Sequence, residues 1–180
     1  MIALRILDIK KFMSAFLIGS FLDDYALIEA QITTFCTFSI DGRLEREFFS
    51  DPQNEAFSFD PAKETADSGN LHEPVEYVSW RHVKERCFDA IKGKRTPLSF
   101  KFVFFYPGVR LSGFLASHDI TVKPELVLGL CLNLRYDGTN LLLTTGTSMK
   151  AFTADRSADQ AGDREVSRLI EALEIRTDLL

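Results

Sequence analysis

Residues 145–150 form the most distinctive polar cluster of the chain, with three hydroxyls, a glycine and a lysine. A glycine at the end of a strand lets backbone N–H groups converge on an anion, and the hydroxyls and the lysine assist. The candidate residues for binding a small anion are therefore Thr145, Gly146, Thr147, Ser148 and Lys150. The same composition is also typical of a strand exit rich in β-branched threonine, with the glycine at a bulge.

The side chains that bind metals or act as nucleophiles are scattered along the chain. His118-Asp119 does not make a catalytic triad, because triads are recognised by geometry rather than by adjacency in sequence. The three cysteines are odd in number and lie among apolar residues, which predicts buried, reduced thiols. The spacing of the histidines and cysteines fits no known pattern of metal ligands, so we predict that no metal is bound, and we expect no cofactor. These residues are His72, His82, His118, Cys36, Cys87 and Cys131.

Phenylalanine is unusually common, with 16 copies. Phe35 and Phe49 fall on the otherwise polar face of the first expected hairpin, beside Glu29, Gln31 and Glu45. We expect the two rings to lie close together and to be covered, either by residues 50–73 or by a second protomer. The alternative is a patch for another protein chain. Either way, Phe35 and Phe49 are candidate interface residues.

Composition limits the classes of function. The chain has 180 residues, 46% of them hydrophobic and 26% charged, which fits one globular domain over residues 1–180. A net charge of −5 argues against nucleic-acid binding, which needs a basic face to displace counterions. The longest uncharged runs, such as Phe12–Leu22, are far shorter than the roughly 20 residues that cross a bilayer. We expect a soluble cytoplasmic protein, also because reduced thiols indicate a reducing compartment.

The clearest strand signal is the alternation over residues 25–40. Asp41-Gly42 follows as a turn signal, and residues 43–49 would form the returning strand. A two-residue turn would place the charges of Arg43 and Glu45 on the apolar face. Because burial of charge costs more than any turn preference, we predict a three-residue loop.

The remaining pattern completes an α+β fold, a mainly antiparallel sheet of hairpins packed with three to four helices. Residues 50–73 read as a long acidic loop, and residues 109–118 fit either a helix or a strand. A two-residue turn at Asp137-Gly138 should keep the leucines of both flanking strands on one face. The other expected elements are a short strand around residues 2–6, a helix after an N-cap at Asp8, a helix from Pro74 to about Lys92, strands at 98–106, 126–136 and 139–147, and a helix at 163–173.

Three stretches carry a resemblance to a known family. They are EAQITTFCTFSIDGR at Glu29–Arg43, IKGKRTPLSFKFVF at Ile91–Phe104, and Leu130–Ser148 with its TTGTS ending. Together they resemble a small bacterial family of unknown function, over most of the chain. The resemblance implies a bacterial cytosolic protein and carries over no site.

These patterns favour a non-enzymatic binding or protein-interaction module. Its partner would be another protein or a second copy of the chain, with no nucleic acid and no membrane. The alternative is a small-ligand (anion) binding protein or a small enzyme with its site near Thr145–Lys150. A cleft that encloses those residues with a histidine or paired carboxylates would favour the alternative.

Overall fold

The computed structural model describes residues 1–49, 76–107, 126–151 and 155–180. Within these ranges, seven strands form one open antiparallel sheet in the order β3-β2-β4-β5-β6-β1-β7. The predicted α+β class is confirmed. The strands are β1 (Ala3–Ile6), β2 (Ala26–Thr33), β3 (Thr37–Asp41), β4 (Ser99–Pro107), β5 (Val127–Tyr136), β6 (Leu141–Met149) and β7 (Thr177–Leu179), and the helices are α1 (Ile9–Leu17), α3 (Trp80–Ile91), α5 (Ser157–Ala172) and the 3₁₀ helix η1 (Arg46–Phe49).

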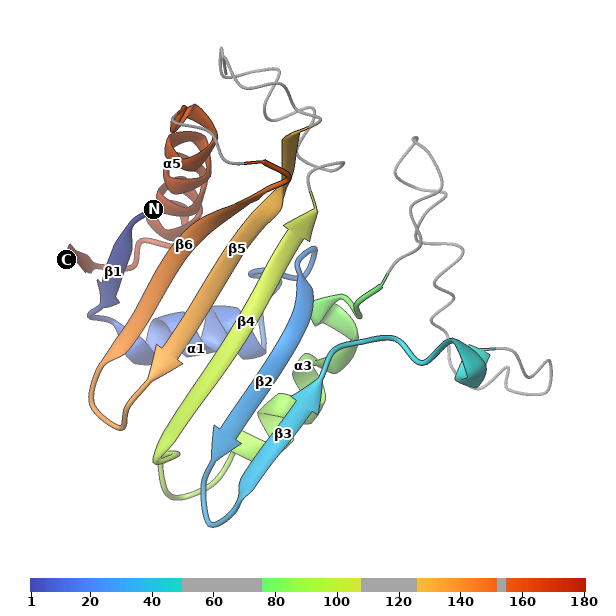
Figure 1. The fold of residues 1–180 in the computed structure, drawn as a ribbon. Helices are drawn as coiled ribbons and strands as arrows, with labels where there is room; N and C mark the ends of the chain where they lie inside the picture. The colour runs from blue at the N-terminus through green and yellow to red at the C-terminus, as the bar shows by residue number, and fades with distance from the viewer. Residues whose placement is uncertain (50–75, 108–125, 152–154) are drawn as a thin grey trace.

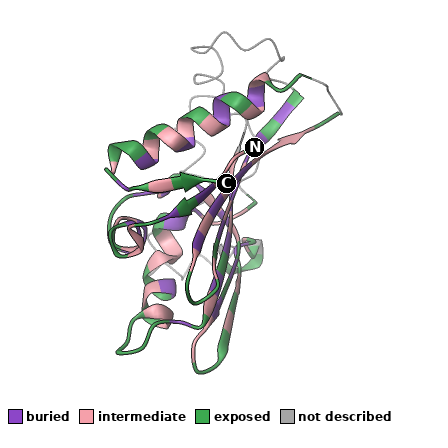
Figure 2. Cartoon of the chain, turned by 90° about the vertical axis from the view of Figure 1, so that its left-hand side faces the viewer, coloured by how far each residue is buried: buried purple, intermediate pink, exposed green. Residues whose placement is uncertain are grey.

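The described α-helices lie on one side of the sheet. Figure 1 shows α1 and α3 behind the strands, with α5 also behind the sheet beside β6 and β1. The side view in Figure 2 shows the same arrangement, with the helices on one side and the strands seen nearly edge-on. The opposite face, called the uncovered face below, carries none of the described α-helices.

Aromatic rings fill the space between the helices and the sheet. Trp80, at the start of α3, is fully buried and stacks on Phe16 of α1 with ring centroids 4.6 Å apart. It also meets Phe102 and Phe104 of β4 edge to face, at 5.5 and 5.2 Å. Its Nε1–H donates to the Phe16 carbonyl oxygen over 3.0 Å, so the one polar atom of the indole is satisfied inside the core.

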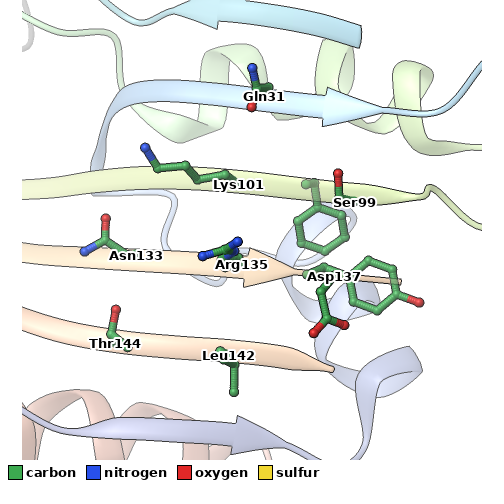
Figure 3. Close-up of a pocket in the computed structure, with 10 residues that line it drawn as sticks. Gln31, Ser99, Lys101, Asn133, Arg135, Asp137, Leu142 and Thr144 are labelled. Carbon is green, nitrogen blue, oxygen red and sulfur yellow. The ribbon is translucent and has the colours of Figure 1, made fainter. Parts of the chain in front are cut away.

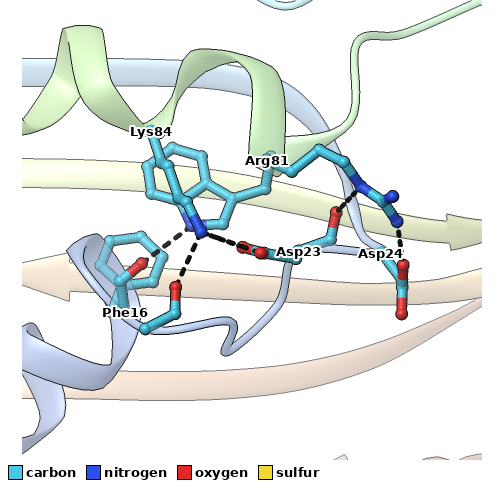
Figure 4. A network of polar contacts seen from close by, with 7 residues as sticks. Phe16, Asp23, Asp24, Arg81 and Lys84 are labelled. Carbon is cyan, nitrogen blue, oxygen red and sulfur yellow. Dashed lines mark hydrogen bonds and ion pairs between the residues drawn. The ribbon is translucent and has the colours of Figure 1, made fainter.

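A polar network fixes α3 against the turn that follows α1 (Figure 4). Lys84 Nζ donates to both carboxylate oxygens of Asp23 at 2.8 Å and to the Gly19 carbonyl at 2.7 Å. One turn earlier, Arg81 pairs with Asp24. The Lys84 and Asp23 side chains are largely sheltered, with exposures of 16% and 22%, so this pair is less screened than ordinary surface pairs. The network therefore orients α3 over the aromatic core.

The first hairpin forms, but at a different place from the one predicted. Residues 25–40 are not one strand: β2 and β3 pair antiparallel around a three-residue loop, residues 34–36. A straight strand of that length would span about 53 Å, well beyond its neighbours, because a strand rises about 3.3 Å per residue. The three-residue loop predicted after Ile40 and the strand predicted at 43–49 are therefore both wrong, because the hairpin loop lies within the predicted strand. Most of that second stretch forms η1 instead.

Gly42 marks the point where the chain leaves β2, rather than a hairpin turn. Its amide still donates to the Ile28 carbonyl (2.9 Å), while its own carbonyl accepts from Val78 N–H (2.8 Å). The residues before α3 thus insert in extended form beside β2, with bridges from Tyr77 to Arg43 and from Ser79 to Ala26. The helix predicted to start at Pro74 therefore begins only at Trp80.

The second hairpin keeps the predicted parity with a longer loop. Tyr136 pairs with Leu141, so the loop contains residues 137–140 rather than two residues. Asp137 Oδ1 accepts N–H bonds from Thr139 (2.9 Å) and Asn140 (2.7 Å), and Gly138 adopts a positive φ of 96°. The predicted loop of two residues and the observed loop of four both have an even length, so the leucines of the two strands stay on the buried face as expected.

Helix ends and the chain's last strand differ from the sequence pattern in smaller ways. The final helix begins at Ser157, before the predicted residue 163, and β7 follows it although no pattern predicted a strand there. Asp8 precedes α1 without capping it by a side-chain hydrogen bond. The predictions for residues 50–73 and 109–118 lie outside the described residues.

Replacing Gly42 with alanine should destabilise the fold. A Cβ atom there would lie 1.8 Å from the Leu27 carbonyl oxygen, a backbone atom that cannot rotate away. We expect a loss of about 1–3 kcal/mol, typical of overpacking, which lowers Tm by about 2–4 °C per kcal/mol at this chain length. Gly93→Ala is the matched control, because its Cβ would lie 3.9 Å from its nearest neighbour, the Arg95 carbonyl oxygen, which is ordinary van der Waals contact. Equal melting temperatures for the two variants would contradict the crowding at Gly42.

Asp8 should give the protein an acid-sensitive clamp. Its carboxylate accepts from Arg176 Nη2 (2.6 Å), Nε and backbone N–H, which lowers the pKa of Asp8 from 3.8 to about 2. Because the folded-state pKa is depressed, the contribution is present above about pH 4 and is lost as the pH falls through about 2. Asp8→Asn should therefore lower Tm near pH 6, and this difference should shrink near pH 2. A difference that stays constant in thermal melts at both pH values would rule the clamp out.

Candidate functional site

The residues of the candidate segment Thr145–Lys150 do not face one common space. Side chains alternate along β6, so Thr145 and Thr147 point to the helix side, whereas Gly146 and Ser148 point to the uncovered face. Thr145 is buried: its Oγ1 accepts from Ile2 N–H (2.8 Å) and bonds to Asp163 of α5. Lys150 is exposed just after the strand, where its amide donates to the Leu126 carbonyl. Anion binding by the five residues together stays a prediction.

Phe35 and Phe49 are placed at the ends of different elements. Phe35 sits in the loop between β2 and β3 with 92% of its surface exposed, and its ring meets that of Phe38 edge to face at 5.9 Å. Phe49 is the last residue of η1, and its side chain lies outside what the structure describes. The expected contact between Phe35 and Phe49 is therefore untested, and their role as interface residues stays a prediction.

A row of cations crosses the uncovered face. Strand register aligns Gln31, Lys101, Arg135, Leu142 and Arg5 on the neighbouring strands β2, β4, β5, β6 and β1. Each flanks buried residues of its own strand, so all five side chains stand on the face opposite the helices. We call Lys101, Arg135 and Arg5 the cationic row.

The row runs along a shallow groove of about 750 Å³. Figure 3 shows the side chains of Gln31, Lys101, Asn133, Arg135 and Thr144 rising on the same side of the neighbouring strands β2, β4, β5 and β6. These five side chains carry amide, hydroxyl, ammonium and guanidinium groups, and Phe100, Tyr136 and Leu142 add apolar surface beside them. The groove is lined by Gln31, Ser99, Phe100, Lys101, Asn133, Arg135, Tyr136, Asp137, Leu142 and Thr144.

The charges in the groove are unequally compensated. Lys101 forms an ion pair with Glu29 on the adjacent strand. Asp137 is engaged by the amides of Asn140 and Thr139, and these hydrogen bonds lower its pKa. Arg135 is exposed and forms no hydrogen bond or ion pair with any residue in the described ranges. Its guanidinium thus offers its donors to a ligand.

A second groove of about 520 Å³ adjoins the first toward the β3 edge. The two share Gln31 and Lys101, so the polar surface continues from β6 across to β3. Glu29, Asp41 and Arg43 make this end mixed in charge, and Arg43 is paired with Glu76 at 3.1 Å. The free positive charge is therefore concentrated near Arg135.

The thiols differ sharply in environment. Burial raises the pKa of Cys87 to about 12 and also raises the pKa of Cys131, so both stay protonated near neutral pH. Cys36 was predicted to be buried, but it is exposed because the hairpin loop falls at residues 34–36. Among the described residues, no group of three or more His, Cys, Asp and Glu is arranged to hold a metal.

Sequence reasoning missed the cationic row. A signal was present, since charged or polar residues alternate with buried apolar ones at Lys101 in β4 and at Asn133 and Arg135 in β5. The pattern showed that these residues face away from the core. It could not show that the two strands are neighbours in a register that puts Lys101 beside Arg135.

None of the helices described is long and apolar enough to cross a membrane. The longest, α5, has 16 residues and divides into a buried side, with Val166 and Ile170, and a charged side, with Arg164 and Arg168. Its apolar residues pack against the sheet, where Gly162 lets the helix approach Leu130 closely.

Thiol labelling should follow the order of exposure. At about pH 8, iodoacetamide should modify Cys36 first, Cys131 more slowly, and Cys87 only after unfolding, because the thiolate is the reactive form. Mass spectrometry of tryptic peptides over time gives the order. Early modification of Cys87 in the folded protein would contradict its burial on the core-facing side of α3.

Comparison with protein families matches residues 15–178 to a family of unknown function, DUF5721. The match begins inside α1 and ends inside β7, so it takes in most of the core, without Leu4, Ile6 and Phe12, and the cationic row except Arg5. Searches of curated proteins and of solved structures gave no significant match. The resemblance seen in the sequence to a family of unknown function is confirmed: the chain belongs to DUF5721.

Proposed function

We propose that this protein is a non-catalytic binding module whose uncovered sheet face holds an acidic segment of another protein. The observation that carries the proposal is Arg135, an exposed guanidinium in the middle of the cationic row with no ionic partner among the described residues. A guanidinium binds carboxylates with two parallel hydrogen bonds, which gives direction as well as charge.

The neighbours of Arg135 favour a ligand rich in acceptors. The side-chain amides of Gln31 and Asn133 and the hydroxyl of Thr144 line the same groove and can each donate a hydrogen bond. Lys101 adds a second cation, although Glu29 partly neutralises it. A carboxylate lying over Arg135 therefore meets donors on three sides.

The openness of the groove favours an extended partner over a single small anion. Exposed charge pairs are worth about 0–1 kcal/mol each, so one carboxylate would bind weakly. Strands lie about 4.8 Å apart, so Lys101 and Arg5 are separated by roughly 14 Å across β4, β5, β6 and β1. An extended peptide covers about 13 Å between residues i and i+4. Acidic residues at that spacing would reach both ends of the cationic row.

The thiol environments support binding rather than thiol-based catalysis. Cys131 opens onto the uncovered face, but burial raises its pKa and keeps the nucleophilic thiolate scarce. The proposal also includes a bacterial origin and a cytoplasmic location. The cytoplasmic location is supported by the three cysteines, which form no disulfide.

The alternative, a small-anion site or small enzyme at Thr145–Lys150, has less support. Thr145 is buried and its hydroxyl is already used by Ile2 and Asp163. Gly146 and Ser148 do share the uncovered face with Arg135, so an anion bound near them would sit on the same side of the sheet. Phosphate and simple carboxylates should then shift the amide signals of Gly146 to Lys150.

Binding of fluorescein-labelled poly-L-glutamate, followed by fluorescence anisotropy, tests the proposal. Arg135→Glu should weaken binding by roughly tenfold or more, equivalent to about 1.4 kcal/mol, because it removes the free guanidinium and adds repulsion. Binding to the wild type should also weaken as salt is added, since exposed charges are screened.

The matched control is Arg164→Glu, the same change of charge at an exposed position on α5, on the helix side of the sheet. It should alter the affinity by less than about twofold, because Arg164 stands on the opposite side of the sheet from the groove and its exposed charge is screened by salt. Equal losses for Arg135→Glu and Arg164→Glu would show that only net charge matters, and no binding by the wild type would refute an acidic partner.

A further inference from the structure

The free edge of β3 provides a second binding surface, and we propose that it pairs two copies of this chain. In this arrangement β3 of one copy lies antiparallel to β3 of another, with the twofold axis at Ser39. The strand ends the sheet in the observed order, so its outer side has no neighbouring strand among the described residues. An edge of this kind presents backbone donors and acceptors that another strand can use.

The ladder identifies which backbone groups face outward. The Gly42 amide bonds to Ile28 on β2, and hydrogen-bonded pairs alternate along an antiparallel ladder. Even-numbered residues of β3 therefore bond inward. Thr33, opposite Thr37, directs its carbonyl away from β3 to Leu98 N–H, which agrees with this assignment. The N–H and C=O groups of Thr37, Ser39 and Asp41 consequently point outward.

The outward edge has a natural end beyond Asp41. Asp41 Oδ1 accepts the N–H of Arg43 over 3.0 Å, so that amide is already bonded within the chain. The pairing-competent edge is thus confined to three residues centred on Ser39. Antiparallel pairing about Ser39 matches all three: Ser39 meets Ser39 of the second copy, and Thr37 meets Asp41 twice. About six backbone hydrogen bonds result.

Side chains favour a second copy in this register. Pairing about Asp41 would put two carboxylates directly opposite each other, which is destabilising, whereas pairing about Ser39 sets each against a threonine. On the helix side, Phe38 meets Ile40 of the second copy, and both are only partly buried in the single chain. Phe35, which contacts Phe38 and is 92% exposed, lies beside this contact. Pairing would therefore also cover apolar surface.

The pairing would join the uncovered faces of two copies into one. Ser39 and Asp41 line the 520 Å³ groove at the β3 edge, so a second copy would extend that groove across the junction. The two cationic rows would then lie on one continuous sheet. Self-association does not depend on acidic-segment binding, and each can be measured without the other.

Two lysine substitutions distinguish pairing about Ser39 from nonspecific association. Ser39→Lys places two lysines opposite each other at the twofold axis, so the dimer dissociation constant should rise by up to about fivefold and recover in high salt. Thr37→Lys, two residues away on the same face, sets each lysine opposite Asp41 of the second copy and should lower that constant. Sedimentation velocity over a range of protein concentrations measures both.

A backbone test complements the charge test. Ser39→Pro removes an outward N–H and leaves the bonds from β3 to β2 intact, so it should abolish the dimer, whereas Ser39→Ala should keep it. Far-UV circular dichroism checks that each variant is folded. If Ser39→Pro does not fold, the comparison of Ser39→Lys with Thr37→Lys tests the dimer arrangement by itself. A wild type that is monomeric at high micromolar concentration, or a dimer that responds equally to both lysines, would overturn the proposal. A monomer whose β3 edge pairs with a different protein would overturn it as well.

Discussion

The indole of Trp80 occupies the place where two helices and the sheet meet, and the rest of the structure depends on that contact. It stacks on Phe16 from α1 and receives the edges of Phe102 and Phe104 from β4. Burial of each such side chain contributes about 1.5–3 kcal/mol, and each aromatic pair about 0.5–1.5 kcal/mol more. The bond from Nε1 to the Phe16 carbonyl fixes the orientation of the indole, and with it the direction of α3.

Because the described helices pack on one side of the sheet, the polar side chains gather on the other. Successive side chains of a strand alternate between faces, so the residues on either side of a core residue such as Phe102 or Leu134 point to the uncovered face. Lys101, Arg135 and Arg5 are such neighbours, brought into one row by the register of four strands. The rigid core beneath holds the row in place, as a binding surface requires.

The first hairpin links the core to both proposed surfaces. Its loop at residues 34–36 sends Ile32 into the core and Gln31 to the groove, and it exposes Phe35 and Cys36 at the tip. The same turn makes β3 the edge of the sheet. At Gly42 the chain turns away from β2, and the residues just before α3 take its place beside β2. The free edge formed by β3 is therefore only five residues long. A short edge limits pairing to one register and guards against unrestricted strand addition.

The sequence alone determined the class of fold, because the alternation of Phe100, Phe102 and Phe104 and of the leucines in β5 and β6 can be buried only as strands with one covered face. It also determined the even number of loop residues in the second hairpin. Loop 34–36 was decided by the tertiary structure, since it contains no glycine, proline, asparagine or aspartate and is set by the length of strand the sheet can use. The cationic row likewise needed the fold: Lys101 and Arg135 lie far apart in sequence, and only strand pairing makes them neighbours.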